Sequence, residues 1–111
     1  MTQMISKHDL TIKATAAVTG ERFVTAAGAP AAAAGNALGV ARSDAQIGGV
    51  FPVTYLGTAI VAAGGAVAVG AGVEADATGR AVTLAAGKKL GTALQAAAAA
   101  GDRIEVALIP N

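Results

Sequence analysis

The residues that could do chemistry in this 111-residue chain are few and mostly far apart. Its one histidine, His8, stands near Ser6 and Asp9, which are the residue types of a nucleophilic triad. Nucleophile, base and orienting carboxylate normally come from separated segments, because three side chains on one short stretch rarely reach the required geometry. Without cysteine or a second histidine, the chain also lacks the ligands of a transition-metal site. We therefore expect no catalytic residues, no metal and no cofactor.

Two carboxylates form the next candidate site. Glu74 and Asp76 are two positions apart, so in a strand their side chains would share one face. Such a pair could bind calcium, or act as the acid and base of a small hydrolase. The competing interpretation is a solvated strand face beside a hairpin, and we prefer it because nothing else in the sequence points to hydrolysis.

Three glycine-containing segments complete the search for chemistry. The sequence Gly87-Lys88-Lys89 is similar to the end of a phosphate loop, but Val82 occupies the place of the earlier glycine and Lys89 that of the Ser/Thr. We expect a solvated turn there. The glycines within 64–65 and 70–72 could bring backbone amides close to a ligand, although closely spaced glycines more often mark turns and strand corners. We therefore predict no small-molecule substrate and no enzymatic activity.

Charge and hydropathy exclude further classes of partner. The net charge is +1, and the eight basic residues are scattered, with no stripe that would follow nucleic-acid phosphates. The uncharged stretch 45–73 is long enough to cross a bilayer, but Pro52 and several glycines divide it into strand-length pieces. Charges at Lys7 and Asp9 interrupt any signal-peptide core. We expect no nucleic-acid partner, no membrane span and no export signal.

Alanine and glycine dominate the composition, while aromatic residues are 3% and tryptophan is absent. The length suits one domain, but not two independent cores. Burial contributes about 25 cal/mol per Å², so small side chains accumulate stability slowly. Association of subunits commonly supplies the missing burial in such chains. We therefore expect an oligomer.

The two halves of the chain read alike. The first, 20–53, contains Leu38-Gly39-Val40-Ala41, then Gly48-Gly49, then an apolar strand pattern. The second, 65–106, repeats this order with Leu90-Gly91-Thr92-Ala93, then Gly101-Asp102, then an alternating pattern. A duplicated unit of about 45 residues built from short strands and glycine turns predicts a small closed β-structure.

Alternation of apolar and polar residues locates the strands. We expect strands over 10–15, 22–25, 36–41, 50–56, 58–62, 66–69, 73–77, 80–84, 89–96 and 103–109, with a hairpin at Thr78-Gly79. Residues 31–34 are a strand or an extended loop, and 42–45 a surface turn or a single helical turn. The alanine-rich residues 93–100 fit a strand end, a turn or a helix, since alanine is the best helix former. The predicted fold is all-β: a small β-barrel or β-sandwich-like domain of short strands over 9–111, after an N-terminal arm of 1–8, with at most one or two short helical turns.

The order of short motifs along the chain resembles the small capsid decoration (cement) proteins of tailed bacteriophages. The motifs that carry the resemblance lie at 20–24, 38–41, 49–53, 61–67, 90–93 and 102–106. This resemblance implies a β-barrel-like domain that attaches to the outer surface of the phage head, commonly as a trimer, and reinforces the shell after it expands. It also implies that the partners are the major capsid protein and further copies of the chain, and that the protein is made in the host cytoplasm.

Such a role requires a surface that recognises a junction present in the assembled shell. An unpatterned segment with apolar anchors can order against a neighbour or extend its sheet. On that ground we predict that the arm and the start of the first strand contribute to shell contact, through Met4, Ile5, Lys7, His8 and Leu10. The alternative is a self-assembling adhesive or head-fibre-type β-module that binds a host surface.

Overall fold

The computed structural model describes residues 6–85 and 87–109, with residues 6–10 and 56 described by their backbone alone. Within these ranges the chain forms β-strands and no helix, so the predicted all-β fold is confirmed. The strands are β1 (Ser6–Lys13), β2 (Phe23–Val24), β3 (Gly39–Ala41), β4 (Val50–Ala62), β5 (Gly72–Ala75), β6 (Ala81–Thr83), β7 (Gly91–Ala93) and β8 (Arg103–Leu108). The expected hairpin at Thr78-Gly79 joins β5 to β6, which pair antiparallel.

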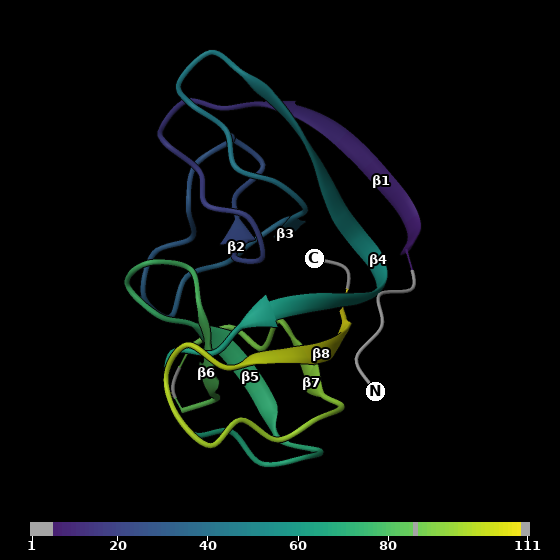
Figure 1. Cartoon of the computed structure of the whole chain (residues 1–111), viewed down its shortest axis with the longest axis vertical. Helices are drawn as coiled ribbons and strands as arrows, with labels where there is room; N and C mark the ends of the chain where they lie inside the picture. Colours follow the sequence, from purple (N-terminus) through teal and green to yellow (C-terminus); the bar gives the residue numbers. More distant parts are fainter. Residues whose placement is uncertain (1–5, 86, 110–111) are drawn as a thin grey trace.

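Strand β4 belongs to two antiparallel sheets (Figure 1). Its first part, 50–57, pairs with β1 on one side and β3 on the other, and β2 follows β3. Its second part, 58–62, pairs with β8, and the second sheet continues through β7 and β5 to β6. Between the two parts, Gly57 has φ of 97°, a left-handed value that permits a bend which other residues rarely adopt. The sheets are therefore joined by continuous backbone.

The two sheets are built alike, pair by pair. In the first unit Ile12 pairs with Phe51, and in the second Val61 pairs with Ile104. The same equivalence relates β2 to β5, β3 to β7, and the first part of β4 to β8. Strand β1 is accordingly the counterpart of the second part of β4. The predicted duplication is confirmed, and it extends over 9–54 and 58–107.

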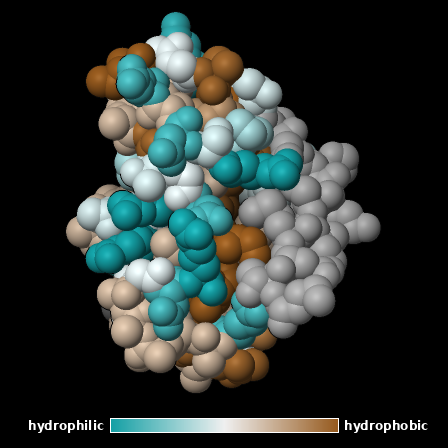
Figure 2. Space-filling view, in the orientation of Figure 1, coloured by the Kyte–Doolittle hydropathy of each residue, from teal (hydrophilic) through white to brown (hydrophobic). Residues whose placement is uncertain are grey.

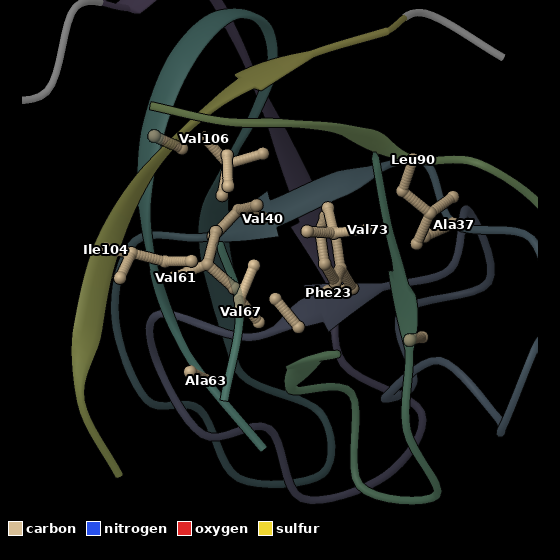
Figure 3. Packing of buried hydrophobic residues seen from close by; sticks show 14 of the residues in the cluster. Phe23, Ala37, Val40, Val61, Ala63, Val67, Val73, Leu90, Ile104 and Val106 are labelled. Carbon is tan, nitrogen blue, oxygen red and sulfur yellow. The ribbon is translucent and has the colours of Figure 1, made fainter. Parts of the chain in front are cut away.

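The core repeats the same equivalence. Buried side chains at corresponding positions are Ala14 and Ala63, Val18 and Val67, Val24 and Val73, Ala41 and Ala93, Phe51 and Ile104, and Val53 and Val106. The core of the second unit also takes in residues from the first unit, among them Phe23, Ala37 and Val40 (Figure 3). Because Phe23 is 1% exposed and belongs to this cluster, the larger cluster is built from both units, while the first unit also has a smaller cluster of its own.

The Leu-Gly pairs that marked the repeat have a packing reason. Gly39 opens β3, and a Cβ atom there would overlap the carbonyl oxygen of Thr54 on β4. Gly91 opens β7, and a Cβ atom there would overlap the carbonyl oxygen of Ala107 on β8. Only a residue without a side chain allows both strands to approach this closely.

Several sequence-based expectations were wrong. Residues 66–69 are not a strand: Val67 makes one bridge to Ala97, and the left-handed φ of 84° at Gly70 turns the chain. The strands expected over 36–41 and 89–96 are reduced to β3 and β7, and residues 94–101 form turns and bends rather than a helix. The predicted closure was also wrong, because a single parallel bridge between Ala63 and Ala81 joins the edges of the second sheet without a continuous ladder.

Candidate functional site

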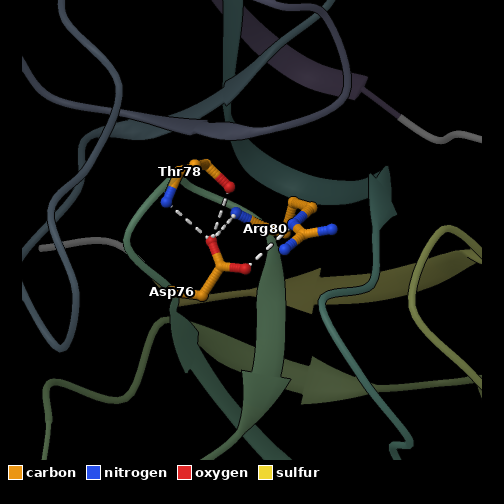
Figure 4. A network of polar contacts seen from close by, with 3 residues as sticks. All are labelled: Asp76, Thr78 and Arg80. Atoms are coloured by element: carbon orange, nitrogen blue, oxygen red, sulfur yellow. Dashed lines mark hydrogen bonds and ion pairs between the residues drawn. The ribbon is translucent and has the colours of Figure 1, made fainter.

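Asp76 is the centre of a polar network in the turn between β5 and β6 (Figure 4). Its Oδ1 accepts hydrogen bonds from the backbone N–H of Thr78 (2.9 Å), the hydroxyl of Thr78 (3.1 Å) and the backbone N–H of Arg80 (2.8 Å). Its Oδ2 pairs with Nε of Arg80 at 2.9 Å. Burial raises the pKa of Asp76, but these hydrogen bonds outweigh it and hold the pKa below its ordinary value of 3.8. An ionised carboxylate with four donors shapes the hairpin and is unsuited to act as a proton donor.

Glu74 serves a different loop. This side chain is buried, and its Oε1 accepts hydrogen bonds from the backbone N–H groups of Ala85 (2.6 Å) and Gly87 (3.1 Å). The expectation of a solvated face was therefore wrong for Glu74, because the loop after β6 lies against it. Each of the two carboxylates binds backbone of its own loop, so the structure does not assemble them into one acid and base pair.

The first strand contains the remaining ionisable candidates. Ser6, His8 and Asp9 lie in β1, where their backbones pair with Gly57, Leu56 and Thr54 of β4, and the register shifts on both sides of His8.

Of the five predicted contact residues, Lys7, His8 and Leu10 lie in β1, whereas Met4 and Ile5 lie outside the described residues. Residues 6–8 of the expected arm thus belong to a strand. The contact role of all five stays a prediction.

The lysine and glycine candidates have structural roles or are solvated. Lys88 and Lys89 are exposed, and the backbone N–H of Lys88 donates to the carbonyl of Ala34 at 3.3 Å. A Cβ atom at Gly64 would overlap the carboxylate of Asp76, so this glycine makes room for the Asp76 network. The lysines are solvated as expected, although residues 88 and 89 form no turn, and the bend at 64–65 agrees with the expected strand corner.

One groove on the described part of the chain has no ionisable residue in its lining. This groove of about 260 Å³ is lined by Thr25, Ala26, Asn36, Ala37 and Leu38. Among the described residues no three His, Cys, Asp or Glu side chains gather where they could hold a metal ion. The same part of the chain contains no helix long and apolar enough to cross a bilayer.

Several large apolar side chains are exposed to solvent, and the sequence analysis did not predict their exposure. Ile47 is 74% exposed and Val50 is 66% exposed. The next most exposed large apolar residues are Val69, at 65%, and Leu94, at 44%. Figure 2 shows hydrophobic surface at both ends of the long axis, which measures 35 Å. The repeat could have revealed this exposure in the sequence. Ile47 and Val50 correspond to Ala100 and Arg103 of the second half, and an arginine at an equivalent position indicates a solvent-exposed site.

The described residues form a duplicated all-β domain in which Asp76 and Glu74 both accept hydrogen bonds from backbone N–H groups. The chain matches the phage cement protein family over residues 3–108, and it belongs to that family. Membership indicates a structural role associated with the phage capsid.

The fold is also similar to a solved structure, the crystal structure of the head fiber gp8.5 N base of bacteriophage phi29. The TM-score is 0.78 at 22% sequence identity, over 92% of this chain and 93% of that chain. At this identity the likeness confirms the fold. No curated protein sequence matches the chain significantly.

Proposed function

We propose that this protein binds the outer surface of the expanded phage head, contacts the major capsid protein and stabilises the shell without catalysing a reaction. The observation that carries the proposal is the match to phage cement proteins over residues 3–108. The structural use of Asp76 and Glu74 supports a non-enzymatic role, because each carboxylate is occupied by backbone donors of its own loop.

Stabilisation follows from differential affinity. A protein that binds the assembled lattice more tightly than free capsid subunits shifts the equilibrium towards the lattice by mass action. Each contact can be weak if one molecule touches several sites, because the second contact forms at a high effective concentration. An oligomer multiplies this effect. We therefore propose a homotrimer, supported by a core of small side chains that limits the stability of a lone subunit.

The proposed shell contact includes the arm and the start of β1, with Met4, Ile5, Lys7, His8 and Leu10. Among the described strands β1 pairs with β4 alone, so one edge of β1 has no strand beside it. Such an edge presents backbone donors and acceptors that can extend the sheet of a neighbour.

The decisive experiment mixes purified protein with undecorated expanded heads and with unexpanded heads. Binding is measured by co-sedimentation, and the heads are then heated to follow their disruption by light scattering. The proposal predicts preferential binding to expanded heads and greater heat resistance after binding. Equal binding to both kinds of head, or no gain in resistance, contradicts it. Light scattering of the free protein tests the trimer separately, and a compact monomer at high concentration refutes that part.

A second candidate is a head-fibre-type module that binds a host surface, favoured by the fold likeness to the phi29 head fiber base. It predicts binding to host cells or glycans without affinity for heads. The same preparation of protein, tested on cells and on heads, separates the two candidates.

A further inference from the structure

One exposed apolar residue lies in a tight turn at one end of the molecule, and a second directly follows that turn as the first residue of β4. The backbone N–H of Gly49 donates to the carbonyl of Gln46 at 2.8 Å, and Gly48 has φ of 87°, which places Ile47 at the second position of a four-residue turn. Ile47 and Val50 are 74% and 66% exposed. We call these two residues the apolar tip.

Two backbone hydrogen bonds to Ala14 fix the turn that carries the apolar tip. The backbone N–H of Gly48 donates to the carbonyl of Ala14 at 2.8 Å, and the N–H of Ala14 donates to the carbonyl of Gly49 at 2.7 Å. A turn fixed by reciprocal hydrogen bonds loses little conformational freedom when a partner binds it. The apolar tip is therefore pre-organised for contact.

The second unit shows that the fold does not need apolar residues at these positions. In the counterpart turn the backbone N–H of Asp102 donates to the carbonyl of Ala99, as the N–H of Gly49 does to Gln46. Gly101 has a left-handed φ of 95°, like Gly48. The counterpart turn is fixed to Ala63 by the same pair of backbone hydrogen bonds, at 2.8 and 2.7 Å. Yet the residues equivalent to Ile47 and Val50 are Ala100 and Arg103, which are both exposed. Since the same backbone forms with either pair of residues, the fold does not require Ile47 and Val50 to be apolar.

Its position relates it to the proposed shell contact. Val50 pairs with Lys13, the last residue of β1, while the predicted contact residues Lys7, His8 and Leu10 lie earlier in the same strand. Figure 1 shows β1 running along one side of the molecule to the end that carries the turn. At about 3.3 Å per residue, Lys7 lies about 20 Å and Leu10 about 10 Å from Lys13 along β1.

We propose that the apolar tip is a second anchor on the capsid shell, which inserts into an apolar depression of the major capsid protein about 10–20 Å from the predicted contact residues of β1. This inference rests on the proposed function. Two attachment points at this spacing let one protomer bind two places on the shell, so each weak contact raises the effective concentration of the other.

The small area of the apolar tip favours the shell over a second copy as its partner. Stable association of two free proteins buries about 800 Å² on each side. Two side chains on a convex turn offer only a fraction of that, so they add useful affinity where another contact already holds the partner. The arm supplies that contact on the shell.

The test exchanges the apolar tip for the residues that its counterpart carries. The double variant Ile47→Ala/Val50→Arg should keep the backbone of the turn, because Ala100 and Arg103 occupy the same backbone in the second unit, with a small loss of stability because Lys13 lies opposite position 50 where Ala62 lies opposite Arg103. We expect its affinity for expanded heads to fall about tenfold or more, as for removal of a central apolar contact. The matched control is Leu94→Arg, an exposed position of the second unit whose equivalent in the first unit is Arg42. It should bind heads like the wild type.

The outcomes separate this inference from the proposed function. If the wild type fails to bind expanded heads, both are wrong. If the wild type binds and the double variant binds equally well, only the second anchor is refuted. If the variant instead changes the mass of the free protein in light scattering, the apolar tip is an interface between copies and the proposal is overturned. The single variant Ile47→Ala, at a 74% exposed position, gives the same reading should the double variant fold poorly.

Discussion

The close approach of β3 to β4 predicts that one methyl group at Gly39 is strongly destabilising. In Gly39→Ala the added Cβ would overlap the carbonyl oxygen of Thr54 and lie 2.9 Å from the Cα atom of Tyr55. Both are backbone atoms of a paired strand, so neither can move without breaking the ladder between Val40 and Thr54. Overpacking of this kind costs about 3 kcal/mol or more. A small domain has only about 5–15 kcal/mol in total.

Substitutions at two other glycines serve as controls for Gly39→Ala. At Gly65 nothing lies within 4 Å of an added Cβ and φ is not left-handed, so Gly65→Ala should stay within about 1 kcal/mol of the wild type. At Gly48 the space is equally open but φ is 87°, so Gly48→Ala should cost about 1–2 kcal/mol. Urea unfolding followed by circular dichroism measures all three. If Gly39→Ala proves as mild as Gly65→Ala, the reasoning from close strand approach is refuted.

Three further predictions concern single side chains. Asp76→Asn should lower the free energy of unfolding by about 2 kcal/mol at pH 7. Folding lowers the pKa of Asp76, so the carboxylate contributes its full stabilisation above the unfolded pKa of about 3.9. That stabilisation is lost as the pH falls through the lower pKa of the folded state. The difference from the wild type in urea unfolding should therefore shrink below about pH 4, and a constant difference would contradict the assignment. Phe23→Ala should cost about 3–5 kcal/mol, measured in the same way, since the ring is buried where the two units meet; a loss under 1 kcal/mol would argue against a shared core. Arg103→Ala should change stability by less than about 1 kcal/mol despite the ion pair with Glu21, because the arginine side chain is 68% exposed; a larger loss that persists in high salt would be inconsistent with a screened surface pair.

The sequence predicted the duplication because its markers have a backbone cause. Gly39 and Gly91 must lack a side chain where strands touch, and Gly48 and Gly101 must adopt left-handed φ. Residues with such requirements leave a recognisable pattern in the chain. The hairpin around Gly79 was predictable for the same reason, since its φ is 85°.

Strand limits in the alanine-rich parts could not be predicted in this way. Alanine fits a strand, a turn or a helix without steric cost, so residues 66–69 and 93–100 carry no local signature, and the hydrogen bonds between Val67 and Ala97 depend on distant parts of the chain. Gly57 was read as a break between two strands, whereas its left-handed φ bends a single strand.

Contact surfaces were the least predictable part. Ile47 and Val50 look like core residues in a list of apolar positions, and exposure emerges only when the turn is placed against Ala14. Glu74 shows the converse, since its charge suggested solvent while the loop after β6 buries it.

The course of β4 has a mechanical consequence. A strand with one part in each sheet leaves no flexible linker about which the two halves could swing, because both sides of Gly57 are fixed by neighbouring strands. A pull along β4 would load the hydrogen bonds of β1 and β8 in shear at the same time, rather than peeling them one by one. The domain would then yield to such a pull as one rigid unit rather than as two separate halves.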